Sequence, residues 1–100
     1  MNSVLVVDKI FKGEDYNKAK LPKAEYENCI FDNCKFSQSD LRNITFTECE
    51  FIDCDLSNAD IKETTIKETT FLNCKILGVN FSDCNSFLLS FTFTNCTLNL

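Results

Sequence analysis

Large apolar side chains recur at every fifth position along most of the chain. A helix repeats at about 3.6 residues and a strand at about two, so neither element accounts for this period. A smaller residue precedes each large one by two positions, as Cys29 precedes Phe31, and the bulky exception is Ile44. The large residues are Leu21, Tyr26, Phe31, Phe36, Leu41, Phe46, Phe51, Leu56, Ile61, Ile66, Phe71, Ile76 and Phe81.

The alternating spacing of two and three predicts a coil. A spacing of two puts both side chains on one face of a short extended segment, and the extra residue in the step of three is consumed by a corner. Each group of five residues then forms one side. Four sides make a coil of about 20 residues, and equivalent residues of successive coils stack about 4.8 Å apart.

Segments 20 residues apart support this stacking. The sequences FDNCKF (31–36), FIDCDL (51–56) and FLNCKI (71–76) align without gaps. FTNCTL (93–98) continues them at a separation of 22, so two residues have been inserted. The inward pattern holds through Cys84 and resumes at Leu88, which predicts a two-residue bulge at a corner near residues 85–87.

The repeated units resemble those of the pentapeptide-repeat proteins, whose unit is a small residue, Asp or Asn, Leu or Phe, and two variable positions. Segments with this pattern are SDLRN (39–43), NADIKE (58–63) and GVNFSD (78–83). The resemblance covers about residues 21–98. It implies an all-β fold, a right-handed quadrilateral parallel β-helix.

The chain is expected to divide into an N-terminal cap and the solenoid itself. Residues 21–100 would form about four coils. Residues 1–20 would form the cap strand and lead-in, with a strand over Val4–Val7. Lys9 and Glu14 depart from the pattern there, because they occupy positions where the repeat places small inward side chains.

The inward residues are expected to fill the interior of the coil. Burial of each large ring stabilises the fold by about 2 kcal/mol. A filled core leaves no channel, so no cofactor is expected. The predicted core residues are Phe31, Phe36, Phe46, Phe51, Leu56, Ile61, Ile66, Phe71, Ile76, Phe81 and Phe93.

The seven cysteines are interpreted as small apolar groups with free thiols. An odd number leaves at least one unpaired. No metal site is expected, because Cys29 and Cys34 would lie on adjacent sides, the chain has no His, and zinc sites favour Cys-x2-Cys spacing. Stacked cysteines such as Cys34 and Cys54 would have parallel side chains, which point the wrong way for a disulfide.

Catalysis has little support in the sequence. The densest carboxylate cluster consists of Glu48, Glu50, Asp53 and Asp55, all of which are expected to face outward. A solenoid with a filled core has convex sides and no cleft that would shift their pKa values. Without His, no Ser or Cys has its usual activating base. The chain is therefore predicted not to be an enzyme.

Asp and Asn recur at two corners of the predicted coil. One set is Asn33, Asp53, Asn73 and Asn95, and the other is Asp40, Asp60 and Asn80. Side chains of this type form hydrogen bonds to nearby backbone groups in turns. A structural role at corners is therefore the preferred interpretation of each residue taken singly.

Negative charge is concentrated after residue 25. Residues 1–25 contain five basic and four acidic side chains, whereas the remainder contains five basic and eleven acidic ones. This surface repels phosphate backbones and anionic membranes, so neither nucleic acid nor membrane is an expected partner. The longest apolar run near the start, Val4–Val7, is too short for a signal-peptide core, and no stretch is long enough to span a bilayer, so the protein is expected to be cytoplasmic. The candidate acidic partner-binding surface is Asp40, Glu48, Glu50, Asp53, Asp55, Asp60, Glu63 and Glu68.

Two functions fit these features. The resemblance implies a DNA mimic that binds DNA gyrase or topoisomerase and gives quinolone resistance, since some pentapeptide-repeat proteins are acidic rods of this kind. The alternative is a structural or protein–protein interaction module with an unknown partner, and no motif separates the two. The open C-terminal coil is expected either to continue in a longer chain or to pair with a second copy as a homodimer.

Overall fold

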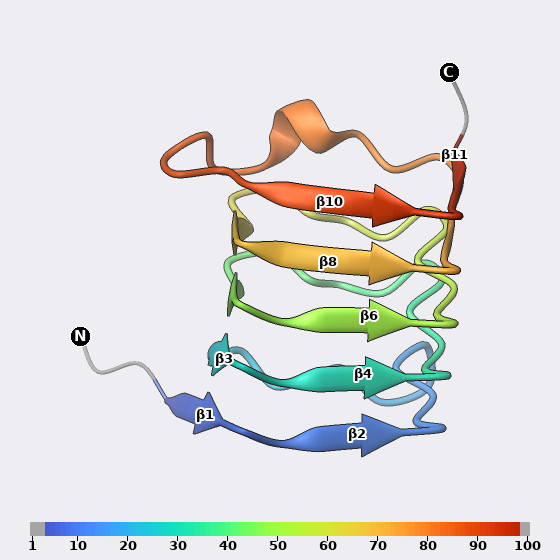
Figure 1. Cartoon of the computed structure of the whole chain (residues 1–100), viewed down its shortest axis with the longest axis horizontal. Helices are drawn as coiled ribbons and strands as arrows, with labels where there is room; N and C mark the ends of the chain where they lie inside the picture. The colour runs from blue at the N-terminus through green and yellow to red at the C-terminus, as the bar shows by residue number, and fades with distance from the viewer. Residues whose placement is uncertain (1–3, 99–100) are drawn as a thin grey trace.

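The computed structural model describes residues 4–98, which form a right-handed parallel β-helix of five coils (Figure 1). Every strand pair is parallel. The predicted fold class is thereby confirmed. The described residues contain a single short 3-10 helix, η1 (Phe81–Asp83), and no helix among them is long and apolar enough to cross a bilayer.

Three stacked sheets form three sides of the coil, and an isolated bridge marks the fourth. The first side consists of β1 (Leu5–Val7), β3 (Glu25–Glu27), β5 (Thr45–Thr47) and β7 (Thr65–Lys67). The second side consists of β2 (Ile10–Lys12), β4 (Ile30–Asp32), β6 (Glu50–Ile52), β8 (Thr69–Leu72) and β10 (Phe91–Thr94). The third side contains β9 (Lys75–Ile76), β11 (Thr97–Leu98) and the bridged residues Asp15, Lys35 and Asp55. The fourth side contains the bridge between Asp40 and Asp60.

The strand register has the expected coil length. Phe31 pairs with Phe51 at a separation of 20 residues. Phe93 pairs with Phe71 at a separation of 22. The hydrophobic period therefore predicts both the number of residues per coil and the strands that lie side by side.

The N-terminal segment forms a further coil of the same stack. β1 and β2 pair in register with β3 and β4, so the structure has five coils where the sequence predicts four and a cap. Lys9 and Glu14 are exposed, and their carbonyl groups accept hydrogen bonds from the next coil, from the N–H groups of Ile30 and Lys35. Long side chains are tolerated at these positions because, within residues 4–98, no further coil stacks on the outer face of this end coil.

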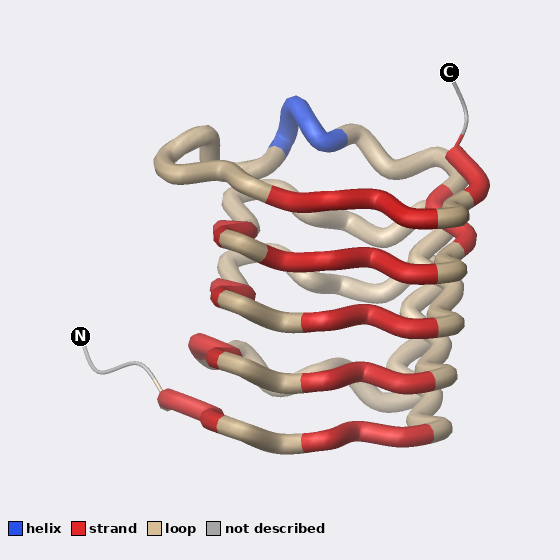
Figure 2. Tube along the Cα trace, viewed as in Figure 1, coloured by secondary structure: helices blue, strands red, loops and turns tan. Residues whose placement is uncertain are grey.

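The register changes in a loop at residues 85–90, between η1 and β10 (Figure 2). The loop extends beyond the corner of the stack below it. The inward pattern does not resume at Leu88 as expected. Leu88 is 61% exposed with a φ of 56°, and Leu89 packs against the core instead. The lengthened corner thus returns the chain to the core one residue later.

Stacked rings fill the interior. Phe11, Phe31, Phe51 and Phe71 form a column with ring centroids 4.8–4.9 Å apart, and Phe93 follows at 5.4 Å. The predicted core residues from Phe31 to Ile76 are buried, whereas Phe81 and Phe93 in the last coil are half-buried. A cavity between Leu41, Phe51 and Phe71 has a volume of about 10 Å³, close to the smallest volume that holds one water molecule.

The two sets of Asp and Asn residues stabilise the coil in different ways. Asn33, Asp53, Asn73 and Asn95 have φ between 52° and 55°, a left-handed conformation that these residue types tolerate better than most. Asp40 and Asp60 lie on the fourth side and not at a corner as expected. Each of them, like Asn80, accepts a hydrogen bond from the N–H two residues later, at 3.1 Å. Backbone conformation explains why Asp and Asn recur in the first set. The expected local hydrogen bond explains why they recur in the second.

Candidate partner-binding surface

The eight acidic residues of the predicted surface are distributed around the rod, over three of its sides and over separate corners. Asp40 and Asp60 lie on the fourth side, and Asp55 lies on the third. Asp53 and Glu63 are exposed at two separate corners. Glu48 and Glu68 lie at the corner between the first and second sides, and Glu50 begins β6 beside them. The fold therefore does not gather them on a single face.

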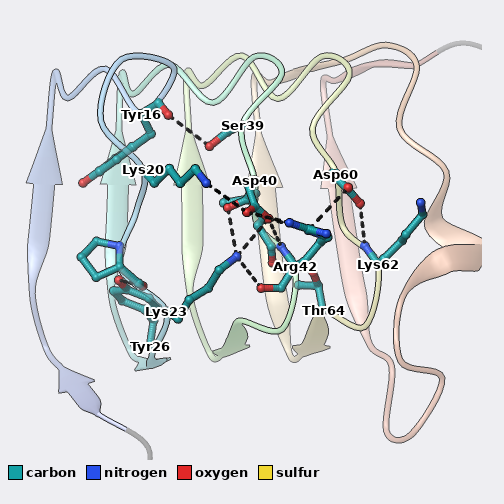
Figure 3. Close-up of polar contacts among 12 residues, drawn as sticks. Tyr16, Lys20, Lys23, Tyr26, Ser39, Asp40, Arg42, Asp60, Lys62 and Thr64 are labelled. Carbon is teal, nitrogen blue, oxygen red and sulfur yellow. Dashed lines mark hydrogen bonds and ion pairs between the residues drawn. The ribbon is translucent and has the colours of Figure 1, made fainter.

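The carboxylates on the fourth side are neutralised by basic side chains (Figure 3). Asp40 forms ion pairs with Lys23 and Arg42 at 3.0 Å and with Lys20 at 3.7 Å. Arg42 also lies 3.7 Å from Asp60. The hydrogen bonds from Arg42, and then from Lys23, hold the pKa of Asp40 well below its usual range. This network stabilises a charged side chain but leaves little net negative charge for a partner.

Asp55 is also unsuited to partner binding. It was expected to be exposed, but it is half-buried, because the Ser57 N–H donates to its Oδ1 at 2.9 Å and holds the side chain along the rod. Its neighbours in register are Lys35 and Lys75. Charges on this side therefore alternate in sign from coil to coil.

Glu48, Glu50 and Glu68 form the acidic corner, the densest group of unpaired carboxylates in the candidate set. All three side chains are exposed. Within residues 4–98, every ion pair shorter than 4.0 Å involves Asp40 or Asp60, so the acidic corner has none. An open hollow of about 400 Å³ at this corner is lined by Asn28, Cys29, Ile30, Glu48, Cys49, Glu50, Glu68 and Thr70.

Two further carboxylates on the same side were missed by the sequence prediction. Glu25 and Glu27 are exposed on β3, directly next to Thr45 and Thr47 of β5 in the strand register. β5 ends immediately before Glu48. The separation of 20 residues between coils would have placed Glu25 and Glu27 beside Thr45 and Thr47, and so on this side. They were missed because the charges were counted separately before and after residue 25, which put the two glutamates in different groups.

The inward position two residues before each large apolar side chain accommodates a hydrogen-bond donor. The Cys54 thiol donates to the carbonyl groups of Phe31 at 3.2 Å and Ile52 at 3.3 Å. Thr64 occupies an equivalent position, and its hydroxyl donates to the Leu41 carbonyl at 2.7 Å. These contacts join successive coils. The position therefore favours Cys, Ser and Thr by hydrogen bonding as well as by size.

Most of the cysteine thiols are buried in this fold. All seven are free, and six of them are buried. Burial raises the pKa of Cys49 and of Cys84 to about 11, so these thiols stay protonated near neutral pH and are weak nucleophiles and metal ligands. Within the described residues, no group of three or more His, Cys, Asp or Glu side chains is arranged to hold a metal ion.

Comparisons with known proteins identify a matching family and similar solved structures. A family model described as a pentapeptide repeat region matches residues 19–100. Full-length QnrB1, a plasmid-mediated fluoroquinolone resistance protein, is a similar solved structure with 22% identity and a TM-score of 0.42. The match covers 94% of this chain and 58% of QnrB1, so this chain spans less than two thirds of that protein.

A second similar structure is Rfr23, a pentapeptide repeat protein from the cyanobacterium Cyanothece 51142. It is 14% identical with a TM-score of 0.44, and the match covers 96% of this chain and 88% of that one. Among curated protein sequences, none matches this chain.

Proposed function

Because this chain belongs to the pentapeptide-repeat family, we propose that it is a non-catalytic binding protein that presents carboxylates to a basic protein partner. The observation that carries the proposal is the acidic corner, where Glu48, Glu50 and Glu68 are exposed without ion pairs. Basic side chains of a partner would supply the missing counter-charge. The filled interior supports a binding role over a catalytic one, since it offers no enclosed site.

DNA gyrase or topoisomerase is the partner we favour, with the rod acting as a DNA mimic in the cytoplasm and quinolone resistance as the consequence. Basic groups that normally hold phosphates would contact the acidic corner. Five coils at about 4.8 Å each give a rod of about 24 Å, which is the length of about seven base pairs. Gyrase binding by this chain would therefore require further coils or a homodimer formed through the C-terminal coil.

A structural or protein–protein interaction module with another partner is the second candidate. The paired charges of the fourth side favour it, because Asp40, Lys23 and Arg42 stabilise the rod and do not resemble a duplex of uniform charge. Under this alternative the acidic corner would still bind a basic protein. Gyrase would not be that protein.

A supercoiling assay with purified gyrase separates the two candidates. The DNA mimic should inhibit supercoiling as its concentration rises, and the variant Glu48→Gln, Glu50→Gln, Glu68→Gln should lose that effect. Glu14→Gln is a control, because it removes an exposed glutamate in the first coil, outside the candidate surface. Unchanged supercoiling in the presence of the wild-type homodimer, or of a longer wild-type chain, would reject the gyrase assignment and leave the interaction module.

A further inference from the structure

The loop at residues 85–90 exposes two large apolar side chains. Phe87 is 67% exposed and Leu88 is 61% exposed. Elsewhere in the part of the chain that the structure describes, exposed large apolar side chains occur only in the first coil and at Leu98 in β11. Such exposure does not stabilise a monomer, and exposed apolar groups of this kind mark interaction sites.

Hydrogen bonds fix the base of this loop. Asn85 Nδ2 donates to Thr65 Oγ1 at 3.2 Å, and the Phe87 N–H donates to Asn85 Oδ1 at 3.1 Å. Leu89 packs against the core on the other side of the turn. The loop therefore holds Phe87 and Leu88 outward while Leu89 anchors it.

The loop adjoins the acidic corner. A hollow of about 340 Å³ is lined by Lys67, Glu68, Leu88, Leu89 and Ser90. Glu68 also lines the hollow that contains Glu48 and Glu50. Glu68 thus lines both hollows, so the exposed Leu88 lies next to the acidic corner.

We infer that the loop and the acidic corner together bind a basic segment of another protein that carries an apolar side chain beside its cations. The inference rests on the proposed function, which supplies the basic partner. Charge complementarity identifies this occupant, because the three carboxylates of the acidic corner outnumber Lys67, the one cation that lines the hollow beside Leu88. The surface therefore repels anionic membranes and nucleic acids and attracts Lys and Arg. Glu48 and Glu68 lie one coil apart, about 4.8 Å, which suits cations at positions i and i+4 of a helix.

This inference is tested by measuring how tightly the full chain binds two helical peptides and one kind of lipid vesicle. The first peptide carries arginines at i and i+4 with a leucine between them, and the second has serine in place of that leucine. The wild-type protein should bind the leucine peptide about tenfold more tightly than the serine peptide. It should not bind phosphatidylglycerol vesicles.

Two loop variants test the apolar contact. Phe87→Ser and Leu88→Asn should each abolish the preference for leucine, and Asn suits the positive φ at residue 88. Ile10→Ser is the matched control, because Ile10 is 70% exposed in the first coil, away from the loop. It should leave the preference unchanged.

Glu68→Gln tests the charged contact. It should weaken binding of both peptides, whereas Glu14→Gln should not, because Glu14 is exposed in the first coil, away from the loop and outside the candidate surface. Equal binding of the two peptides by the wild-type protein would overturn the inference, as would vesicle binding that depends on Phe87.

Failure of the inference is distinguishable from failure of the proposed function. If gyrase is unaffected but peptide binding depends on Phe87 and Glu68, the gyrase assignment is wrong and the composite surface stands. If gyrase is inhibited equally by wild type and by Phe87→Ser, and both peptides bind equally, the loop has no part in binding and the proposed function stands.

Discussion

At the scale of the residue, the inward position two residues before each large side chain has two preferences. It favours a small side chain, and it favours one that donates a hydrogen bond. Cys54 is 3% exposed and donates to carbonyl groups of its own coil and of the previous one. The sequence predicts the size constraint from the regular recurrence of small residues. It does not reveal the donor, because the acceptor lies 23 residues earlier in the chain and its direction depends on how the coils stack.

Cys54→Leu should destabilise the protein by about 1–3 kcal/mol through overpacking, and Cys54→Ser should cost much less because a hydroxyl can donate to the same carbonyl groups. Cys96→Leu is the matched control, since this equivalent position in the last coil is only half-buried. Urea unfolding gives the free energies. An unchanged midpoint for Cys54→Leu would show that the position has room for a larger side chain.

Glutamate at a left-handed corner position carries a conformational cost. Glu63 has a φ of 59°, so Glu63→Asn should stabilise the protein by about 0.5–1 kcal/mol. Glu25→Asn removes the same charge from β3, where φ is not positive, and should bring no such gain. If the two variants shifted the unfolding midpoint equally, the gain would come from charge and not from the backbone.

At the scale of the element, the sequence predicts the coil and its strand partners well. It does not predict which charged side chains form ion pairs. The period of five predicts the strand partners, since Phe31 and Phe51 do pair. It also identifies residues that point outward. It cannot show that Asp40 has three cationic neighbours, because Lys20 and Lys23 reach it from the preceding turn of the chain with long, flexible side chains. Ion pairs of this kind depend on side-chain conformation.

The fourth side should make stability depend on pH. The pKa of Asp40 is lowered in the folded state by Arg42 and Lys23, so its contribution is complete above the unfolded value of about 3.9 and is lost as pH falls toward the folded value. Asp40→Asn keeps an acceptor for the Arg42 N–H. Its free energy of unfolding should lie below that of wild type at neutral pH, with the difference shrinking as the pH falls below about 4.

Asp60→Asn is the matched control for this effect, because Asp60 has one ion pair, at 3.7 Å. Urea unfolding at neutral and acidic pH measures both variants. A difference between wild type and Asp40→Asn that did not change with pH would mean that the ion pairs do not stabilise the fold.

At the scale of the whole molecule, negative charge is concentrated in the third coil. Residues 41–60 contain five acidic side chains and one basic one, whereas residues 61–80 contain two acidic and three basic. The sequence predicts one candidate surface of eight carboxylates, whereas the structure brings only Glu48, Glu50 and Glu68 together at the acidic corner. The difference arises because a count of charges ignores which of them lie within reach of each other across the coils.

Binding of gyrase by the wild-type protein and by the variant Glu48→Gln, Glu50→Gln, Glu68→Gln, measured by titration calorimetry at low and high salt, tests the central claim most directly. With the homodimer or a longer chain, we predict wild-type binding that weakens steeply as salt rises, and a loss of about tenfold or more in the variant at low salt. Equal affinities for the two proteins, or wild-type binding that is insensitive to salt, would contradict the claim that the acidic corner contacts the partner.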